Sequence, residues 1–225
     1  YNFAKKIICV SREIKDEILN ETFINKKNFE VIYNPISQEN INKIKNKNNW
    51  LYKNTKKFLN IGSLKYAKNH ELLIKSFSIM NTKIDSELII IGEGPLYDKL
   101  NKLIDKLNLN LKIQIINYQN DISYFYKTAD LFILTSRWEG FGNVIVESFT
   151  HGTPVVSVDC PYGPSEIITK EYLGSIVSSN EPNKISESII TFLSKPILKK
   201  KIIEYSQNYN VSDQVEKYLK VFDVN

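Results

Sequence analysis

Short apolar runs of strand length alternate with longer amphipathic segments along most of the chain. Continuous apolar runs predict buried strands, and apolar residues three or four positions apart predict helices. The strands are expected near 57–61, 87–91, 112–116, 131–135, 154–158 and 175–177, with helices between them, for example at 70–80 and 96–107. Because strands that alternate with helices form βαβ units, the pattern predicts an α/β fold with a doubly wound, Rossmann-like parallel sheet.

The two ends of the chain lie outside this repeat. A strand is expected at 6–10, a helix at 12–21 and a second strand at 29–33, and the Lys/Asn-rich stretch 42–54 then indicates a solvated connector. Two more helices are expected at 198–205 and 211–222. The pattern therefore divides the chain into an N-terminal unit with its connector (1–54), a Rossmann-like domain (55–195) and C-terminal helices (196–225).

The composition fits a globular protein with a hydrophobic core, since 42% of the 225 residues are hydrophobic and 12% are aromatic. The longest apolar runs are far shorter than the ~20 residues that span a bilayer. Two cysteines do not make a disulfide framework, which favours a reducing compartment. The chain enters a strand pattern almost at once after Tyr1, so we expect it to be cut from a longer protein.

The net charge is +5. It reflects either a bias toward Lys, Asn and Ile or a surface that favours anionic lipid headgroups or phosphorylated substrates. The lysines are scattered rather than arranged in a stripe, which argues against nucleic acid as a partner.

The most informative segment begins with Glu139 and ends with Glu147, directly after the strand expected at 131–135. Its glycines, Gly140 and Gly142, let backbone N–H groups approach an anion, and the helix that follows points its positive end at that anion. Such a turn lies at the carboxyl edge of an open α/β sheet, where ligands bind. Since carboxylates accept hydrogen bonds from paired hydroxyls, the segment suggests a site for a sugar attached to a phosphate.

A second turn, from Gly62 to Lys68, brings a cation to the same edge. Six of the eight glycines directly follow a predicted strand there, namely Gly62, Gly92, Gly94, Gly140, Gly142 and Gly163. Tight βα turns are the alternative for Gly92 and Gly94, whereas the convergence of the six on one edge, with charged neighbours, favours a binding site for the set. We expect Lys68, where a helix begins, to bind a diphosphate, and a solvated lysine is the alternative. The chain has no Asp-x-Asp pair and His70 and His151 are isolated, so no metal site is expected.

These pieces resemble the retaining glycosyltransferases of family 4, which have the two-domain GT-B fold. The Glu-x7-Glu spacing with an interior Phe141-Gly142 is the signature of that family, and further matches follow in its order. They are Val10-Ser11, Asn34-Pro35, Gly62-Ser63-Leu64 with Lys68-Asn69, Gly92-Glu93-Gly94-Pro95 and Gly152-Thr153-Pro154-Val155-Val156. The segment 159–167 (DCPYGPSEI) is similar to the version found in hexose and N-acetylhexosamine transferases of glycan assembly.

The resemblance implies roles for individual residues. Lys68 would neutralise the diphosphate of the donor, Glu139 would face the donor sugar, and Glu147 would accept hydrogen bonds from the ribose. The implied donor-binding set is Gly62, Ser63, Lys68, Asn117, Tyr118, Gly140, Phe141, Gly142, Asn143, Val144 and Glu147, with Glu139 and Lys68 as the catalytic pair. Within it, Asn117 and Tyr118 match the position that reads the base.

Several residues keep a second interpretation. Ordinary surface or capping carboxylates are the alternative for Glu139 and Glu147, and simple packing is the alternative for Tyr118. Ser63 stands where the family usually has Arg, which removes a charge that Lys65 is a candidate to supply. Further along, Ser165 is expected to cap a short helix. Glu166 beside it is open to contact with donor or acceptor.

The resemblance implies that the chain comprises the donor-binding half of a transferase and the end of its N-terminal, acceptor-binding domain. Such an enzyme would move a hexose or N-acetylhexosamine from a UDP-sugar to a hydroxyl of a cell-surface or lipid-linked glycan, with retention of configuration and without a metal or other cofactor. We expect it in the cytoplasm, with peripheral contact to the inner face of the cell membrane.

Two alternatives remain open. One is a sugar-nucleotide epimerase built on the same two-domain scaffold, and the other is a non-catalytic module that binds a nucleotide-sugar. Product analysis separates the epimerase from the transferase, because an epimerase turns over without an acceptor.

Overall fold

The structure, a computed structural model, describes residues 4–23, 25–37, 50–119 and 121–222. Its larger sheet contains β3 (Lys56–Ile61), β4 (Ser86–Ile91), β5 (Ile113–Ile116), β6 (Leu131–Leu134), β7 (Val155–Val158) and β8 (Gly174–Val177). These strands are ordered β5-β4-β3-β6-β7-β8, and every neighbouring pair is parallel. This is the doubly wound order in which the winding reverses between β3 and β6. The predicted fold class and the six predicted strands are confirmed.

Helices cover both faces of this sheet. One face carries α2 (His70–Asn81), α3 (Tyr97–Lys106) and α7 (Pro182–Leu193), and the other carries α4 (Ser123–Thr128), α5 (Asn143–Thr150), the short α6 (Pro164–Ile167) and α8 (Lys199–Ser206). Side chains of successive strand residues point to opposite faces. Phe58 accordingly packs in the first hydrophobic cluster and Leu59 in the second. All six residues of β4 are buried, as expected for a strand covered on both sides.

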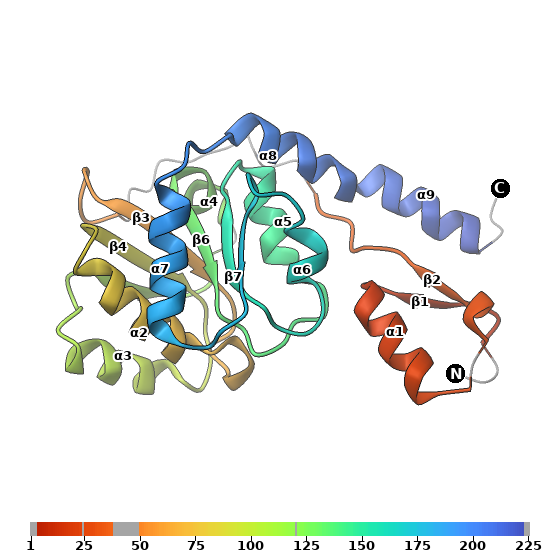
Figure 1. Ribbon diagram of the computed structural model, residues 1–225, viewed down its shortest axis with the longest axis horizontal. Coiled ribbons are helices and arrows are strands. Elements are labelled where there is room, and N and C mark those ends of the chain that lie inside the picture. Colours follow the sequence, from red (N-terminus) through yellow and green to blue (C-terminus); the bar gives the residue numbers. More distant parts are fainter. Residues whose placement is uncertain (1–3, 24, 38–49, 120, 223–225) are drawn as a thin grey trace.

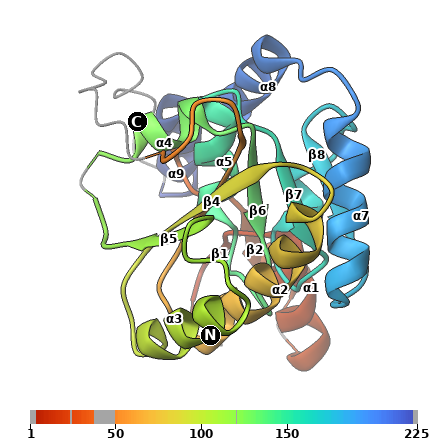
Figure 2. The ribbon, with the colours of Figure 1, turned by 90° about the vertical axis from the view of Figure 1, so that its left-hand side faces the viewer.

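A smaller parallel sheet stands apart at the other end of the molecule (Figure 1). It consists of β1 (Ile7–Cys9) and β2 (Phe29–Val31), with α1 (Arg12–Glu21) and a 3₁₀ turn, η1 (Lys26–Asn28), between them. We call β1, α1 and β2 the N-terminal unit. Figure 2 looks from the larger sheet toward this unit, which lies behind it. The unit has a small core of its own around Ile7, Cys9 and Phe29.

The C-terminal helices cross from the larger sheet to the N-terminal unit. From α8 the chain continues through the 3₁₀ turn η3 (Gln207–Tyr209) into α9 (Val211–Val221), which extends over the N-terminal unit in Figure 1. A backbone bridge joins Ile36, after β2, to Asn210, before α9. The helices predicted at 198–205 and 211–222 are thus confirmed to within one residue at each end.

The predicted connector at 42–54 falls partly on residues 42–49, which lie outside the described residues. At Trp50 the expectation of a solvated segment is wrong. The Trp50 side chain is buried in the sheet's second hydrophobic cluster, and its indole N–H donates to the Thr128 hydroxyl at 2.9 Å. The carboxylate of Glu87 accepts hydrogen bonds from the backbone N–H groups of Leu51 and Tyr52. This end of the connector is therefore anchored to the domain. The buried indole contributes a large apolar surface to the core, although the residues around it are polar.

Among the described residues, no helix is both long and apolar enough to cross a bilayer. Cys9 and Cys160 are both buried and unpaired as disulfides, as the cysteine count indicated.

Candidate functional site

The turns that follow β3 and β4 meet at the carboxyl edge of the sheet, next to the point where the winding reverses. A side chain at Gly92 would place its Cβ 2.0 Å from the Gly62 carbonyl oxygen, so only glycine allows this approach. Close packing of the two backbone turns therefore accounts for Gly92, in agreement with the interpretation that a tight βα turn requires this glycine. Gly62 is different, because the nearest atoms to a Cβ there belong to the Lys68 side chain, at 3.5 Å. The aliphatic stem of Lys68 thus lies over Gly62.

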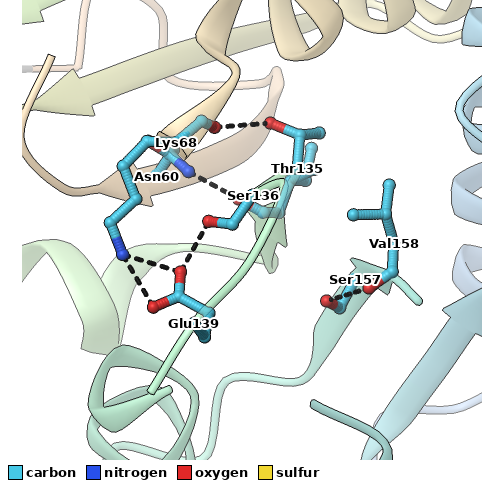
Figure 3. A network of polar contacts seen from close by, with 8 residues as sticks. Asn60, Lys68, Thr135, Ser136, Glu139, Ser157 and Val158 are labelled. Atoms are coloured by element: carbon cyan, nitrogen blue, oxygen red, sulfur yellow. Dashed lines mark hydrogen bonds and ion pairs between the residues drawn. The ribbon is translucent and has the colours of Figure 1, made fainter. Parts of the chain in front are cut away.

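Lys68 and Glu139 form an ion pair at this edge. The Lys68 ammonium donates to both carboxylate oxygens of Glu139, at 2.6 and 2.8 Å, and the Ser136 hydroxyl donates to Oε1 at 2.5 Å (Figure 3). The side chains are 22% and 8% exposed, respectively, so water screens the pair little. The structure thus brings together two residues, 71 positions apart, that the sequence assigned to one site.

Hydrogen bonds from the segment after β6 hold the turn after β3 in place. The Thr135 hydroxyl lies 3.3 Å from the Lys68 carbonyl oxygen and 3.2 Å from that of Asn69, and the Arg137 N–H donates to the Ala67 carbonyl at 2.7 Å. Ala67 and Lys68 belong to a 3₁₀ turn, η2 (Tyr66–Lys68), that leads into α2. The backbone that carries Lys68 is therefore held from both sides of the winding reversal, because it follows β3 and is hydrogen-bonded to the segment after β6.

The glycine segment opens into α5 as predicted. Gly142 is the N-cap of α5 at φ 94°, a left-handed conformation that favours glycine. Phe141 is buried and its ring stacks on Tyr33, with the ring centroids 5.3 Å apart. The first N–H groups of a helix have no intrahelical partner. The amides around Asn143 and Val144 are thus available to an anion at the start of α5.

Glu147 lies one turn along α5, in a different environment. Its carboxylate accepts a hydrogen bond from the Tyr126 hydroxyl at 2.9 Å. Glu147 lines a pocket of about 320 Å³ together with Asn143, Pro35 and Ser37. Burial raises the pKa of Glu147, and the Tyr126 hydrogen bond offsets only part of that rise. A carboxylate that has lost water and is hydrogen-bonded to a neutral hydroxyl is suited to accept further hydrogen bonds from ligand hydroxyls.

Asn117 and Tyr118 follow β5 at the same edge of the sheet. Tyr118 is 61% exposed, and the Asn117 carbonyl accepts a hydrogen bond from the Gln119 side chain. They come from the edge strand, two strands away from β3. Ser63 is also exposed, in the turn after β3. The roles of these three residues stay predictions.

Other titratable groups near the site are held uncharged by burial. Burial lowers the pKa of His70 to about 4, and the charge of Lys68 adds to this effect. Burial likewise raises the pKa of Cys160 to about 12, with the charge of Glu139 as a second cause. His151 stacks on Tyr126, with centroids 5.4 Å apart, and burial lowers its pKa. Both histidines are packed inside the fold, in agreement with their structural interpretation. No group of three His, Cys, Asp or Glu suited to a metal occurs in the part of the chain that the structure describes.

The sequence did not point to two residues that the site uses. Ser136 is the second residue after β6 and lies three positions before Glu139, and this spacing is the signal that identifies it. Tyr126, on α4, has no local signal, because its contact with Glu147 spans 21 positions of sequence.

One local prediction is wrong. Gly163, not Ser165, is the N-cap of α6, and Pro164 is its first residue. The Ser165 hydroxyl instead donates to the Glu13 carboxylate of α1, at 2.7 Å. Proline is favoured at the first helical position, because the N–H that it lacks would have no intrahelical partner there and its fixed φ suits a helix, so the helix begins at Pro164, before Ser165.

Comparison with known proteins gives a family. The family described as "Glycosyl transferases group 1" matches residues 40–209. An uncharacterized glycosyltransferase of Methanocaldococcus jannaschii is 33% identical over 178 residues, which are 76% of this chain and 44% of that protein. The N-acetylgalactosamine-N,N'-diacetylbacillosaminyl-diphospho-undecaprenol 4-alpha-N-acetylgalactosaminyltransferase of Campylobacter jejuni is 32% identical over 200 residues, 89% of this chain and 54% of that protein. The chain thus spans about half the length of these relatives.

The fold also matches solved structures. The structure of the Anabaena protein HepE in complex with UDP and glucose superimposes with a TM-score of 0.85 at 20% sequence identity. The match covers 100% of this chain and 64% of the Anabaena chain. At this identity the likeness establishes the GT-B fold of the region.

Proposed function

The chain belongs to the group 1 glycosyltransferases, and from this premise we propose that it holds the donor of a retaining, family 4 hexosyltransferase. The donor is a UDP-sugar that carries a hexose or N-acetylhexosamine, and the complete protein transfers this sugar to a hydroxyl of a cell-surface or lipid-linked glycan. The observation that carries the proposal is the Lys68–Glu139 pair beside the start of α5, at the winding reversal of the sheet. Ligands of open α/β sheets bind at that position.

The charges of the site fit a sugar diphosphate. Lys68 and the first amides of α5 supply positive charge and N–H donors for the diphosphate. Glu139 and Glu147 supply acceptors for the hydroxyls at the two ends of the donor, the sugar and the ribose. The proposed base-reading residues, Asn117 and Tyr118, and the two turn residues Gly62 and Ser63 complete the donor site. UDP is the nucleotide bound in the Anabaena structure, which supports the choice of uracil.

The relatives support the acceptor class. The Campylobacter protein is named for a sugar carried on diphospho-undecaprenol, a lipid-linked acceptor. We place the complete protein in the cytoplasm, in peripheral contact with the membrane that holds such a lipid. The N-terminal unit is then the end of the acceptor-binding domain, residues 55–195 are the donor domain, and the C-terminal helices join the two.

The proposed transfer keeps the new bond on the face that the leaving group occupied. The bond between the anomeric carbon and the phosphate oxygen breaks, and its electron pair goes to the diphosphate. The acceptor oxygen forms the new bond, and its proton passes to the departing phosphate oxygen. Lys68 and the α5 amides lower the barrier because they stabilise the negative charge that develops on that phosphate. Glu139 orients the sugar, and no metal is required for this step.

Calorimetric titration with UDP, UDP-sugars, GDP and uridine tests the donor assignment. We expect UDP and at least one UDP-sugar to bind and to raise the melting temperature, because a ligand of the folded state stabilises that state. EDTA should leave the UDP affinity unchanged. Equal binding of GDP and UDP would contradict the choice of uracil, and the absence of any nucleotide binding would contradict the proposed function.

The full transferase is tested with a radiolabelled UDP-sugar and a lipid-linked acceptor, and the anomeric configuration of the product is read by NMR. An inverted product would contradict the retaining assignment. Turnover of the UDP-sugar without acceptor, with conversion to an epimer, would favour the epimerase.

A further inference from the structure

The N-terminal unit contacts the loop after β7 through two glutamates that face each other. The α1 backbone N–H of Glu13 donates to Glu166 Oε1 at 2.9 Å. In return, the Glu13 carboxylate accepts the backbone N–H of Tyr162 at 2.6 Å and the Ser165 hydroxyl at 2.7 Å. Each carboxylate thus satisfies a backbone donor of the opposite segment, across about 150 positions of sequence. We call this pair, Glu13 and Glu166, the carboxylate clasp.

Each partner of the clasp has a physical reason to be acidic. The first N–H groups of α1 have no intrahelical partner, and the positive end of a helix favours a carboxylate. Ser11, the N-cap of α1, accepts the Ile14 N–H, and Glu166 of α6 accepts the Glu13 N–H. The Tyr33 hydroxyl, beyond β2, also donates to Glu166, at 3.1 Å. The clasp therefore caps α1, and Glu166 joins both α1 and the segment after β2 to α6.

The opposite side of the same loop touches the candidate donor site. The backbone N–H of Glu139 donates to the Pro161 carbonyl at 3.0 Å. Two residues further, a Cβ at Gly163 would lie 1.8 Å from the Phe141 carbonyl oxygen, so the loop is packed directly on the glycine segment. Residues 161–166 are thus held between α1 on one side and the segment 139–141 on the other.

From this arrangement we propose that Glu13 and Glu166 are positioning residues, through which the docked N-terminal unit fixes the backbone of Glu139. The proposal rests on the proposed function, since Glu139 faces the donor sugar there. Lys68 and Ser136 hold the Glu139 carboxylate, whereas the Pro161 carbonyl holds its backbone N–H. The N–H of the same peptide group, that of Tyr162, is held by Glu13 of the clasp.

Loss of the clasp should affect the binding of the sugar and the binding of the nucleoside differently. Glu147 is supported by Tyr126 of α4, and this contact does not pass through the loop 161–166. Loss of the clasp should therefore disturb recognition of the sugar and spare recognition of the nucleoside. A variant that merely weakens the whole fold would instead reduce the affinity for UDP and UDP-sugar by the same factor.

The test measures hydrogen exchange at the Glu139 amide and the affinities for UDP and a UDP-sugar in four variants. In Glu13→Ala and Glu166→Ala we expect exchange at Glu139 to accelerate ~10-fold or more. The UDP-sugar affinity should fall by about the same factor, while the UDP affinity stays unchanged. Asp16→Ala, which removes an exposed carboxylate from the same helix, should match the wild type. Glu166→Gln should rescue the clasp, because its side-chain oxygen still accepts the Glu13 N–H.

Two results would overturn the proposal: unchanged exchange at the Glu139 amide in both alanine variants, or equal losses of affinity for UDP and UDP-sugar. Failure of the proposed function gives a different result, since the wild-type chain would then bind neither ligand. The exchange measurement still decides in that case whether the clasp holds Glu139.

Discussion

The two glutamates that frame the glycine segment lie in opposite environments. Glu139 shares its carboxylate between the Lys68 ammonium and the Ser136 hydroxyl. Glu147, eight positions later, accepts from the neutral phenol of Tyr126, and burial raises its pKa. We propose that the same residue type in one motif has two tasks. In this proposal Glu139 balances a cation that a bound diphosphate would contact instead, and Glu147 is a desolvated acceptor that gains from added hydroxyl donors.

The largest effect is expected from removal of the cation. Lys68→Ala should weaken UDP binding ~10- to 100-fold, since hydrogen bonds to charged groups contribute about 1.5–3 kcal/mol. Uridine, which lacks the diphosphate, should bind as before. Titration of both ligands checks this difference, with Lys75→Ala as the control that removes an exposed lysine of α2. Equal losses for UDP and uridine would indicate a defect of the fold instead of a lost phosphate contact.

Removal of the Glu147 carboxylate should have a smaller effect on binding. Glu147→Ala should weaken UDP and uridine alike, by ~10-fold, because both ligands carry the ribose. Glu147→Gln should be milder, since its amide oxygen still accepts one hydroxyl. Calorimetry measures the losses of UDP and uridine affinity in each variant. If both variants bind UDP as tightly as the wild type, Glu147 does not contact the ribose.

The raised pKa of Glu147 also predicts a change in stability with pH. A carboxyl whose pKa is raised by folding prefers its proton in the folded state, so the stability it contributes is lost as the pH rises through the raised pKa. Glu147→Gln removes this cost and should melt above the wild type at pH 7. The advantage should vanish at pH values below the ordinary range of a glutamate.

Glu71 provides the matched control for that experiment. Hydrogen bonds from Lys75 and Lys99 lower its pKa, so Glu71→Gln should be less stable than the wild type at pH 7, by a small amount because the group is exposed. Melting curves from pH 3 to pH 8 check both signs. A Glu147→Gln variant that is less stable than the wild type at pH 7 would show that Tyr126 stabilises the charged carboxylate more than burial disfavours it.

The smallest expected change is a gain. Ser63→Arg restores the residue that the family usually carries and should tighten UDP binding about threefold, as one partly screened charge contact does. Uridine affinity should not change. If UDP affinity is also unchanged, titration of Lys65→Ala shows whether Lys65 already supplies this charge.

The sequence predicted the strands well because the strand residues are buried on both faces. The apolar run Leu88–Ile91 in β4 has the length and the β-branched residues typical of a strand within a covered sheet. The site motif was also predictable from Gly142. The helix α5 begins after a residue in the left-handed conformation, and such a position favours glycine.

What the sequence did not show depends on contacts between distant segments. The ion pair of Lys68 with Glu139, the contact of Tyr126 with Glu147 and the carboxylate clasp all join residues that are 21 or more positions apart. Ser165 is of a residue type that often caps helices, but its hydroxyl donates to the Glu13 carboxylate of α1. Tertiary packing decides such contacts, and local pattern does not record them.

The most direct test of the account is a crystal structure of this chain with UDP. We predict that the Lys68 ammonium leaves Glu139 and contacts a phosphate oxygen at ~2.8 Å, within the range of charged hydrogen bonds. The first amides of α5 should face the same phosphate, and the Glu147 carboxylate should accept a ribose hydroxyl. UDP bound away from the start of α5, with the Lys68–Glu139 pair intact, would contradict the account.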